Sequence, residues 1–236
     1  MKIKIFEGEL MDKIKLIEAI VTWQGEGPDS GKRMLLVRFK RCQLGCKKCD
    51  TQVKMECSIE AEYSIEEFKK VIKKEKLGLL ITGGEPTFGK QLDDTINLIK
   101  SLKGIKIINV ETNGCDLIGL YEETKYFPNI KYIYSPKFNN EKDVYEAIRI
   151  VEHLNDKNQY RNLYIKLVYF EESIEFNNMF LQRLNNDFPD MNDNIYLMPE
   201  GKTREELLIN SPYIFDQCEE FKVNFTSRDH VIYNFI

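Results

Sequence analysis

The sequence has no long apolar segment, and this absence excludes one class of protein at the outset. The 236 residues are 42% hydrophobic and 31% charged, which is the composition of an ordinary globular domain. No apolar run approaches the roughly 18 to 20 residues that a membrane-spanning helix needs. We therefore expect no membrane-spanning segment and no membrane partner.

Two further features are missing, and each excludes a setting or a partner. Residues 1–9 alternate charged and apolar side chains and contain neither the longer apolar stretch nor the small-residue cleavage site of an export signal. The 34 Lys and Arg residues are spread along a chain of net charge -4, without a basic block for a phosphate backbone. We expect a cytoplasmic protein with no nucleic-acid partner.

No repeat, linker or low-complexity segment interrupts the chain, and its length suits a single domain over residues 1–236. Six apolar runs are expected to be strands, and they begin at Met34, Leu77, Ile105, Ile130, Leu163 and Ile195. One helical pattern starts at Ser64, and four others cover residues 91–103, 141–153, 174–186 and 203–219. One or two earlier strands are expected in 3–22, and a last one in 221–236.

Strands that alternate with helices in this way predict an α/β fold with a parallel sheet and helices outside it. Six units are too few for a closed eight-stranded barrel. The pattern therefore favours a partial, about six-stranded parallel β/α barrel.

Cysteine supplies the most informative motif, Cys42-x3-Cys46-x2-Cys49. Three thiolates this close together are expected to bind a metal centre, whereas structural zinc sites and most iron–sulfur sites use four protein ligands. A 4Fe–4S cluster bound by only three cysteines keeps one iron open for another ligand. The alternatives are a zinc knuckle completed by Cys57 or a histidine, and free buried thiols.

Polar segments follow the expected strands directly. They are the cysteine motif and residues 82–86 (TGGEP), 111–114 (ETNG), 135–137 (SPK) and 199–201 (PEG). In parallel α/β folds the carboxyl ends of the strands carry the ligand, although turn chemistry alone also places Gly, Asn and Pro there. Arg38 lies inside an apolar run, so it needs either a nearby carboxylate or an anionic ligand as its partner.

The cysteine motif resembles that of the radical S-adenosylmethionine (SAM) superfamily, in which the open iron chelates the amino and carboxylate groups of SAM. Together with other segments it is similar to the 7-carboxy-7-deazaguanine synthase family of the queuosine and deazapurine pathway. These segments are QGEG at 24–27, Arg38 four residues before the first cysteine, Cys49-Asp50-Thr51, TGGEP, ETNG, SPK and His230. Their order along the chain is more discriminating than any one of them.

The resemblance implies a radical SAM lyase in which SAM, and no side chain, supplies the radical. It implies that Cys42, Cys46 and Cys49 bind the 4Fe–4S cluster. The residues it implies for SAM are Gly83, Gly84, Glu85, Thr112, Asn113, Ser135 and Lys137. A flavodoxin- or ferredoxin-type protein is implied as the electron donor, and a homodimer as the assembly.

The substrate implied by the resemblance is 6-carboxy-5,6,7,8-tetrahydropterin, whose ring contracts with loss of ammonia. Gln24 and Glu26 suit the hydrogen-bonding edge of the pterin, and Arg38 suits its carboxylate as a bidentate fork. His230 matches the family's C-terminal histidine near the substrate, and Thr51 matches its protein ligand to Mg²⁺.

The sequence departs from the family pattern at several positions. Lys48 stands where an aromatic residue commonly packs near the adenine, and the tail ends at Asn234-Phe235-Ile236 without the usual Trp-Gly-rich ending. Trp23 is expected in the core, and Cys57, Cys115 and Cys218 are expected to be buried or incidental. Two other functions remain open: a radical SAM activase of a glycyl-radical enzyme, and a zinc-binding adaptor.

Overall fold

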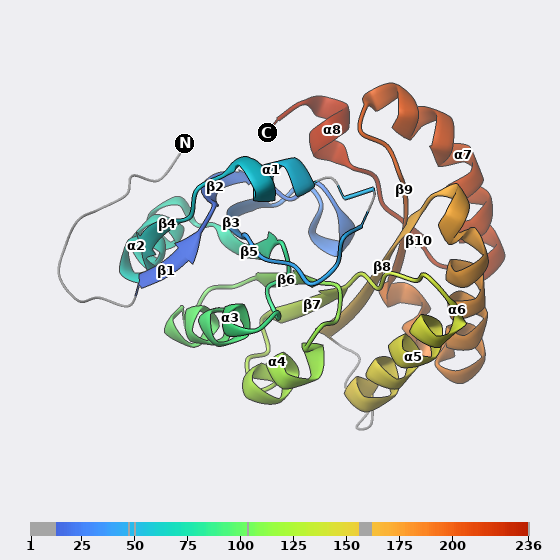
Figure 1. Cartoon of the computed structure of the whole chain (residues 1–236), viewed down its shortest axis with the longest axis horizontal. Coiled ribbons are helices and arrows are strands. Elements are labelled where there is room, and N and C mark those ends of the chain that lie inside the picture. Colours follow the sequence, from blue (N-terminus) through green and yellow to red (C-terminus); the bar gives the residue numbers. More distant parts are fainter. Residues whose placement is uncertain (1–12, 47, 50, 103, 156–161, 236) are drawn as a thin grey trace. The chain divides into compact units, whose positions relative to one another are not determined.

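The computed structural model describes residues 13–46, 48–49, 51–102, 104–155 and 162–235. It divides into two compact units, the first built from 13–23 and 32–132 and the second from 24–31 and 133–235 (Figure 1). The two units are described in turn. The single domain expected over 1–236 stays a prediction.

The first unit is built on a mostly parallel sheet. Its strands, in the order in which they pair, are β2 (Glu18–Trp23), β3 (Arg33–Phe39), β5 (Gly78–Gly83) and β6 (Ile108–Thr112). β2 is antiparallel to β3, while β3, β5 and β6 are mutually parallel. β7 (Ile130–Tyr134) starts in this unit and ends in the second.

Helices and a small two-stranded sheet surround these strands. The helices are α1 (Gln52–Cys57), α2 (Ile65–Glu75), α3 (Lys90–Ser101) and α4 (Leu117–Thr124). α3 and α4 pack side by side, as Figure 1 shows. The small sheet pairs β1 (Lys13–Leu16) with β4 (Ala61–Ser64) in antiparallel fashion. The inner strands are buried along almost their whole length, as their continuous apolar runs require.

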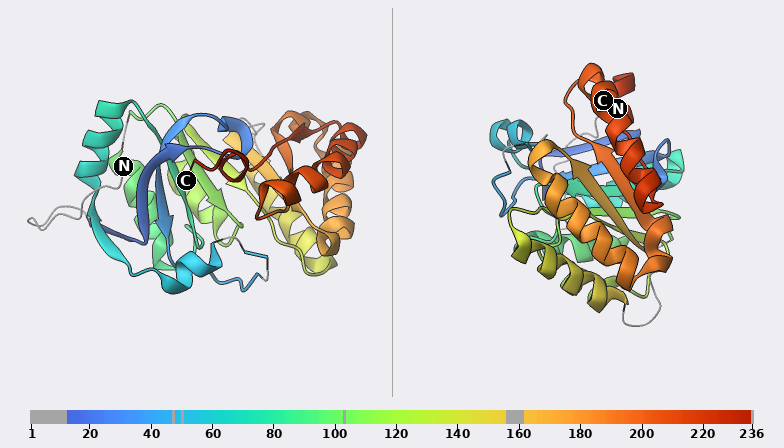
Figure 2. Two further views of the ribbon diagram at one scale, coloured as in Figure 1. Left: turned by 90° about the horizontal axis from the view of Figure 1, so that it is seen from above. Right: turned by 90° about the vertical axis from the view of Figure 1, so that its right-hand side faces the viewer.

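The second unit repeats the alternation of strands and helices. Its parallel strands are β8 (Leu163–Tyr169), β9 (Ile195–Pro199) and the short β10 (Asn224–Phe225). Its helices are α5 (Glu141–Asn155), α6 (Ile174–Asp187), α7 (Arg204–Phe221) and α8 (Asp229–Tyr233). The right-hand view of Figure 2 shows α6 between α5 and α7 in one layer outside the strands.

All six predicted strands and the five predicted helices are confirmed, and parallel pairing is seen for β3, β5, β6, β8 and β9. The segment 221–236 was wrongly expected to be a strand, because only Asn224–Phe225 pairs and the chain then turns into α8. Trp23 was wrongly expected in the core, since 47% of it is exposed at the end of β2. Within the described ranges, no helix has both the length and the apolarity to cross a membrane.

Thr203→Ala is expected to lower the free energy of unfolding by about 1 kcal/mol. Thr203 starts α7 with a capping box: its Oγ1 accepts from Glu206 N at 3.1 Å, and Glu206 Oε2 accepts from Thr203 N at 3.2 Å. Urea unfolding would measure the loss. Lys202→Ala, one exposed residue earlier, is the control, and equal stability of the two variants would contradict the prediction.

Candidate functional site

The cysteine motif lies in the loop of residues 40–49, between β3 and α1, which we call the cysteine loop. Cys42, Cys46 and Cys49 are half-buried and line one cavity of about 630 Å³. Phe88 and Met55 line it as well. The sequence had predicted that these three thiols would be gathered, and the fold gathers them around a space large enough for a cofactor.

A 4Fe–4S cluster fits these cysteines better than a single metal ion does. Within the described part of the chain, no three His, Cys, Asp or Glu side chains are close enough to hold one ion. A cluster distributes its ligands over separate irons, so the three sulfurs need not converge on one point. Cys57 is exposed and does not line the cavity, which speaks against a zinc knuckle completed by this residue.

Gly83 and Gly84 allow the chain at the end of β5 to lie directly against the start of the cysteine loop. β3 and β5 pair Phe39 with Gly83, and Gly84 N donates to Phe39 O at 2.9 Å. A Cβ on Gly83 would lie 2.4 Å from Phe39 N, and one on Gly84 would lie 2.2 Å from Arg41 O. Gly83 also has a φ of 120°, which disfavours other residues. Their expected contact with SAM stays a prediction, but their packing against the cysteine loop is plain.

Gln91 holds the residue before the first cysteine in place, although it belongs to no motif singled out from the sequence. Its Oε1 accepts from Arg41 N at 2.9 Å, and its Nε2 donates to Arg41 O at 2.9 Å and to Glu85 O at 2.6 Å. The side chain is buried in the first turn of α3. A buried glutamine at the start of a helix is the only signal that could have indicated this role.

Glu85 joins the ends of β5 and β6 from inside the protein. Only 1% of the residue is exposed. Its Oε1 accepts from Thr87 N at 2.9 Å and from the hydroxyls of Thr87 and Thr112, each at 2.6 Å. Its Oε2 accepts from Asn113 N at 2.6 Å. This carboxylate therefore orders the TGGEP and ETNG segments, whatever it contributes to a bound ligand.

Asn113 extends this network to the cysteine loop. Its Nδ2 donates to Cys42 Sγ at 3.6 Å, and its Oδ1 accepts from Gln43 Nε2 at 2.9 Å. Hydrogen bonds to ligand sulfurs are one means by which proteins tune iron–sulfur clusters. Lys48, which replaces the expected aromatic residue, is exposed.

Arg38 has a carboxylate partner within the first unit. Its Nε donates to Glu18 Oε2 at 2.9 Å, from the position directly opposite on β2. Lys54 Nζ lies 2.8 Å from Glu18 Oε1. Burial alone would raise the pKa of Glu18, but Lys54 and Arg38 outweigh it and lower the pKa. Of the two partners that the sequence allowed for Arg38, the structure supplies the carboxylate.

Thr51 lies next to the cysteines, as the sequence expects. Its Oγ1 is 3.4 Å from Cys49 Sγ, and the residue directly precedes α1 without a capping hydrogen bond from its side chain. Asp50, which belongs to the same motif, lies outside the described residues.

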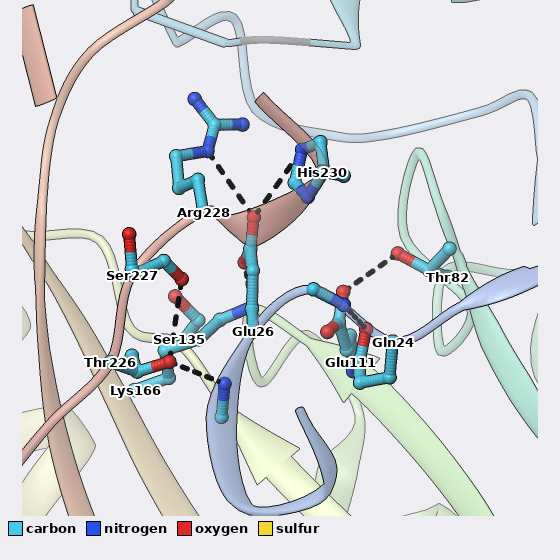
Figure 3. A network of polar contacts seen from close by, with 12 residues as sticks. Gln24, Glu26, Thr82, Glu111, Ser135, Lys166, Thr226, Ser227, Arg228 and His230 are labelled. Atoms are coloured by element: carbon cyan, nitrogen blue, oxygen red, sulfur yellow. Dashed lines mark hydrogen bonds and ion pairs between the residues drawn. The ribbon is translucent and has the colours of Figure 1, made fainter. Parts of the chain in front are cut away.

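In the second unit, Glu26 of the QGEG loop is surrounded by three basic side chains (Figure 3). Glu26 Oε2 lies 2.6 Å from Lys166 Nζ, and Oε1 lies 3.2 Å from Arg228 Nε and 3.9 Å from His230 Nε2. Burial alone would raise the pKa of Glu26, but these three charges hold it well below its usual range. We call these four residues the Glu26 cluster.

The C-terminal segment is bound tightly to the QGEG loop. Asp229 N donates to Gly25 O at 2.9 Å, and Thr226 Oγ1 accepts from Gly27 N at 2.7 Å. A Cβ on Gly25 would lie 2.5 Å from His230 Nδ1, so glycine is needed for the histidine to pack there. These hydrogen bonds join segments that are far apart in the sequence, and they bring Glu26 and His230 together.

The other predicted residues of the second unit are ordered too. Gln24 is buried, and its Oε1 accepts from Gly25 N at 3.0 Å. Lys137 Nζ donates to Ser135 Oγ at 2.7 Å, just after β7. The predicted site residues thus form two groups. The cysteines, residues 83–85, Thr112, Asn113, Arg38 and Thr51 lie in the first unit, and Gln24, Glu26, Ser135, Lys137 and His230 lie in the second.

Comparisons with known proteins agree with this geometry. A family model described as a 4Fe-4S single cluster domain matches residues 24–157. The 7-carboxy-7-deazaguanine synthase of Clostridium acetobutylicum is 33% identical over 102 residues, which are 42% of this chain and 46% of that protein. The synthase of Buchnera aphidicola is 30% identical over 146 residues, which are 52% of this chain and 61% of that protein. The matched region thus spans about half the length of these relatives.

The crystal structure of QueE from Escherichia coli superposes with a TM-score of 0.59 at 21% identity. The superposition covers 92% of this chain and 95% of that one. The two chains therefore share a fold.

Gly84→Ala is expected to leave a folded protein that binds much less iron, because its Cβ would meet the Arg41 carbonyl and displace the cysteine loop. The overpacking is expected to cost about 1 to 3 kcal/mol of stability. Iron per chain after anaerobic reconstitution is the measurement. Gly78→Ala, at the start of β5, is the control, because its Cβ meets the movable Met34 Sδ at 2.2 Å. Equal iron in both variants would refute the prediction.

Glu26→Gln is expected to cost about 3 to 5 kcal/mol at neutral pH, because it leaves Lys166 and Arg228 buried without their counter-charge. The lowered pKa of Glu26 means that its contribution is complete above the unfolded pKa of about 4.3 and declines as the pH falls below it. The difference in the free energy of unfolding between Glu26→Gln and the unmodified protein, measured by urea unfolding, should therefore decrease as the pH falls.

Glu62→Gln is the control for this measurement. It breaks an exposed pair with Lys13 at 3.2 Å and should cost at most about 1 kcal/mol. If the loss of unfolding free energy in Glu26→Gln stays constant from neutral pH into acid, the assigned charge state of Glu26 is contradicted.

Proposed function

The chain belongs to the family of 4Fe-4S single cluster domains, and from this premise we propose that it is a radical SAM lyase, a 7-carboxy-7-deazaguanine synthase. The observation that carries the proposal is the gathering of Cys42, Cys46 and Cys49 around one cavity beside the glycine-rich end of β5. The names of the relatives support the choice of reaction within the radical SAM class.

The cluster would be held by these three cysteines, and SAM by the open iron together with residues 83–85, Thr112, Asn113, Ser135 and Lys137. When bound, the cluster would supply one electron that splits SAM into methionine and a 5′-deoxyadenosyl radical, and the protein contributes position and electrostatics. Glu85 already accepts three bonds on Oε1 and one on Oε2. Oε2 accepts only one bond and has capacity for another, so it is the atom we propose for the SAM ammonium.

The proposed substrate is 6-carboxy-5,6,7,8-tetrahydropterin, whose ring contracts and loses ammonia. Gln24, Glu26 and His230 would meet the pterin, and Arg38 its carboxylate. Among the described residues, the bond to Glu18 uses only Nε of Arg38, and the two terminal nitrogens form the fork that suits a carboxylate. Thr51 would supply the protein ligand to Mg²⁺, which keeps few protein ligands beside substrate oxygens.

The finer features of the fold and setting belong to the same proposal. We propose that the strands form a partial barrel of about six parallel strands within one domain. We further propose a cytoplasmic homodimer that takes electrons from a flavodoxin- or ferredoxin-type protein. The alternation of parallel strands and helices in each unit supports the barrel.

The test of the proposed function uses the full chain purified without oxygen. It should be brown, with cluster absorbance near about 400 nm. Incubation with reductant, SAM, Mg²⁺ and the carboxytetrahydropterin should release ammonia and a deazapurine. Cleaved SAM without deazapurine would overturn the synthase assignment and favour an activase, whereas a colourless zinc protein would overturn both.

Arg38→Ala should reduce turnover and leave the iron content intact. The reduction in turnover should correspond to about 2 to 5 kcal/mol if the pair with the substrate carboxylate is buried. Glu18→Ala is the matched variant, because it breaks the same internal ion pair from the other side. Steady-state rates of the two variants separate the roles. Equal losses in both would mean that Arg38 acts only through Glu18.

A further inference from the structure

The Glu26 cluster contains two basic residues for which neither the sequence nor the proposed function accounts. Lys166 comes from β8, and Arg228 comes from the segment before α8. Both are bonded to the Glu26 carboxylate, one to each oxygen, at 2.6 and 3.2 Å. Arg228 is also anchored through a bond from its Nη1 to Gly201 O at 2.8 Å.

Placing these charges inside the protein is costly. Lys166 lies between Ile165 and Leu167 on a strand whose neighbouring side chains are buried and apolar. Taking two cations and a carboxylate out of water carries a desolvation penalty that their mutual attraction often fails to exceed, so buried pairs are weak evidence of stabilisation. A role in the site offers a better reason for keeping them.

Exposure within the cluster differs from one member to the next. The side chains of Lys166 and Arg228 are 6% and 8% exposed, whereas those of Glu26 and His230 are 12% and 21% exposed. Glu26 and His230 are therefore the more exposed members of a cluster that is buried as a whole, and a ligand would approach it from their side. Figure 3 shows Glu26 extending toward Arg228 and His230.

Glu26 retains the capacity to accept further hydrogen bonds. An ionised carboxylate has about four acceptor sites, two on each oxygen. Lys166 occupies one site on Oε2 and Arg228 occupies one on Oε1. One site on each oxygen is left, which suits two adjacent N–H donors in a bidentate arrangement.

We propose that Lys166 and Arg228 are positioning residues which keep the Glu26 carboxylate ionised and aimed, so that it accepts two hydrogen bonds from the ring N–H and exocyclic amino group of a pterin. This inference rests on the proposed function, which names a pterin as substrate. A protonated Glu26 would instead present a hydroxyl to one of these donors and lose that bond. The charged groups that face Glu26 are Lys166 from β8 and Arg228 and His230 from the C-terminal segment.

The variant Lys166→Met tests this by keeping the length of the side chain and removing its charge. The probe is 6-carboxypterin, an oxidised and unreactive relative of the substrate, whose fluorescence reports binding to the cluster-loaded, SAM-bound protein. We expect about tenfold weaker binding in acid, the loss of roughly one charge-assisted hydrogen bond. We also expect affinity to recover as the pH is raised, because the pKa of Glu26 rises when a cation is removed.

Controls separate positioning from simple structural support. Lys100→Met removes a surface pair with Glu123 and should leave binding unchanged at every pH. Arg228→Lys keeps the charge and should bind better than Arg228→Met, which gives a second test if Lys166→Met does not fold. In the turnover assay, Lys166→Met should raise KM while kcat, iron content and SAM cleavage without substrate stay near their normal values.

The outcomes distinguish this inference from the function on which it rests. Affinity for 6-carboxypterin that falls equally at all pH values in Lys166→Met, or does not fall at all, would overturn the positioning role even if deazapurine is formed. Binding with the expected pH dependence, but without deazapurine from the reduced substrate, would overturn the synthase assignment and leave pterin recognition standing. Failure of the unmodified protein to bind the probe would overturn the inference itself.

Discussion

The close approach of two backbone segments at Gly83 and Gly84 is the constraint on which the cysteine loop depends. A side chain at either position would occupy space that the backbone of residues 39–41 fills. The strand β5 can therefore bond directly to the chain that leads into Cys42, through Gly84 N to Phe39 O and Glu85 N to Arg41 O. Backbone contacts of this kind position the cysteine loop.

Polar side chains then complete what the glycines begin. Gln91 bonds both the N–H and the carbonyl of Arg41, and Glu85 ties the ends of β5 and β6 together. Asn113 carries the connection to the sulfur of Cys42. In the second unit, the Glu26 cluster has the corresponding role, because it binds the QGEG loop to the C-terminal segment through buried charges. Each unit thus orders its own predicted site residues by satisfying buried polar groups.

Sequence patterns predicted the framework well because strands buried on both faces are continuously apolar. The strands that begin at Ile130, Leu163 and Ile195 start where the pattern placed them. Short elements escaped: α4 has only one or two turns of pattern, and α8 follows a strand of two residues. Arg38 illustrates the limit of what the sequence predicts. Its place in an apolar run required a partner, but the identity of that partner, Glu18, depended on the pairing of β2 with β3.

By itself, the sequence determined the class of chemistry and the order of the α/β units, because the spacing of three cysteines and the period of apolar residues are local properties of the chain. Only the tertiary structure decided which side chains complete the site. Gln91 lies 50 residues from Arg41, and Lys166 and Arg228 lie 140 and 202 residues from Glu26. No local pattern marks such partners, because their role comes from desolvated contacts that exist only once the chain has folded.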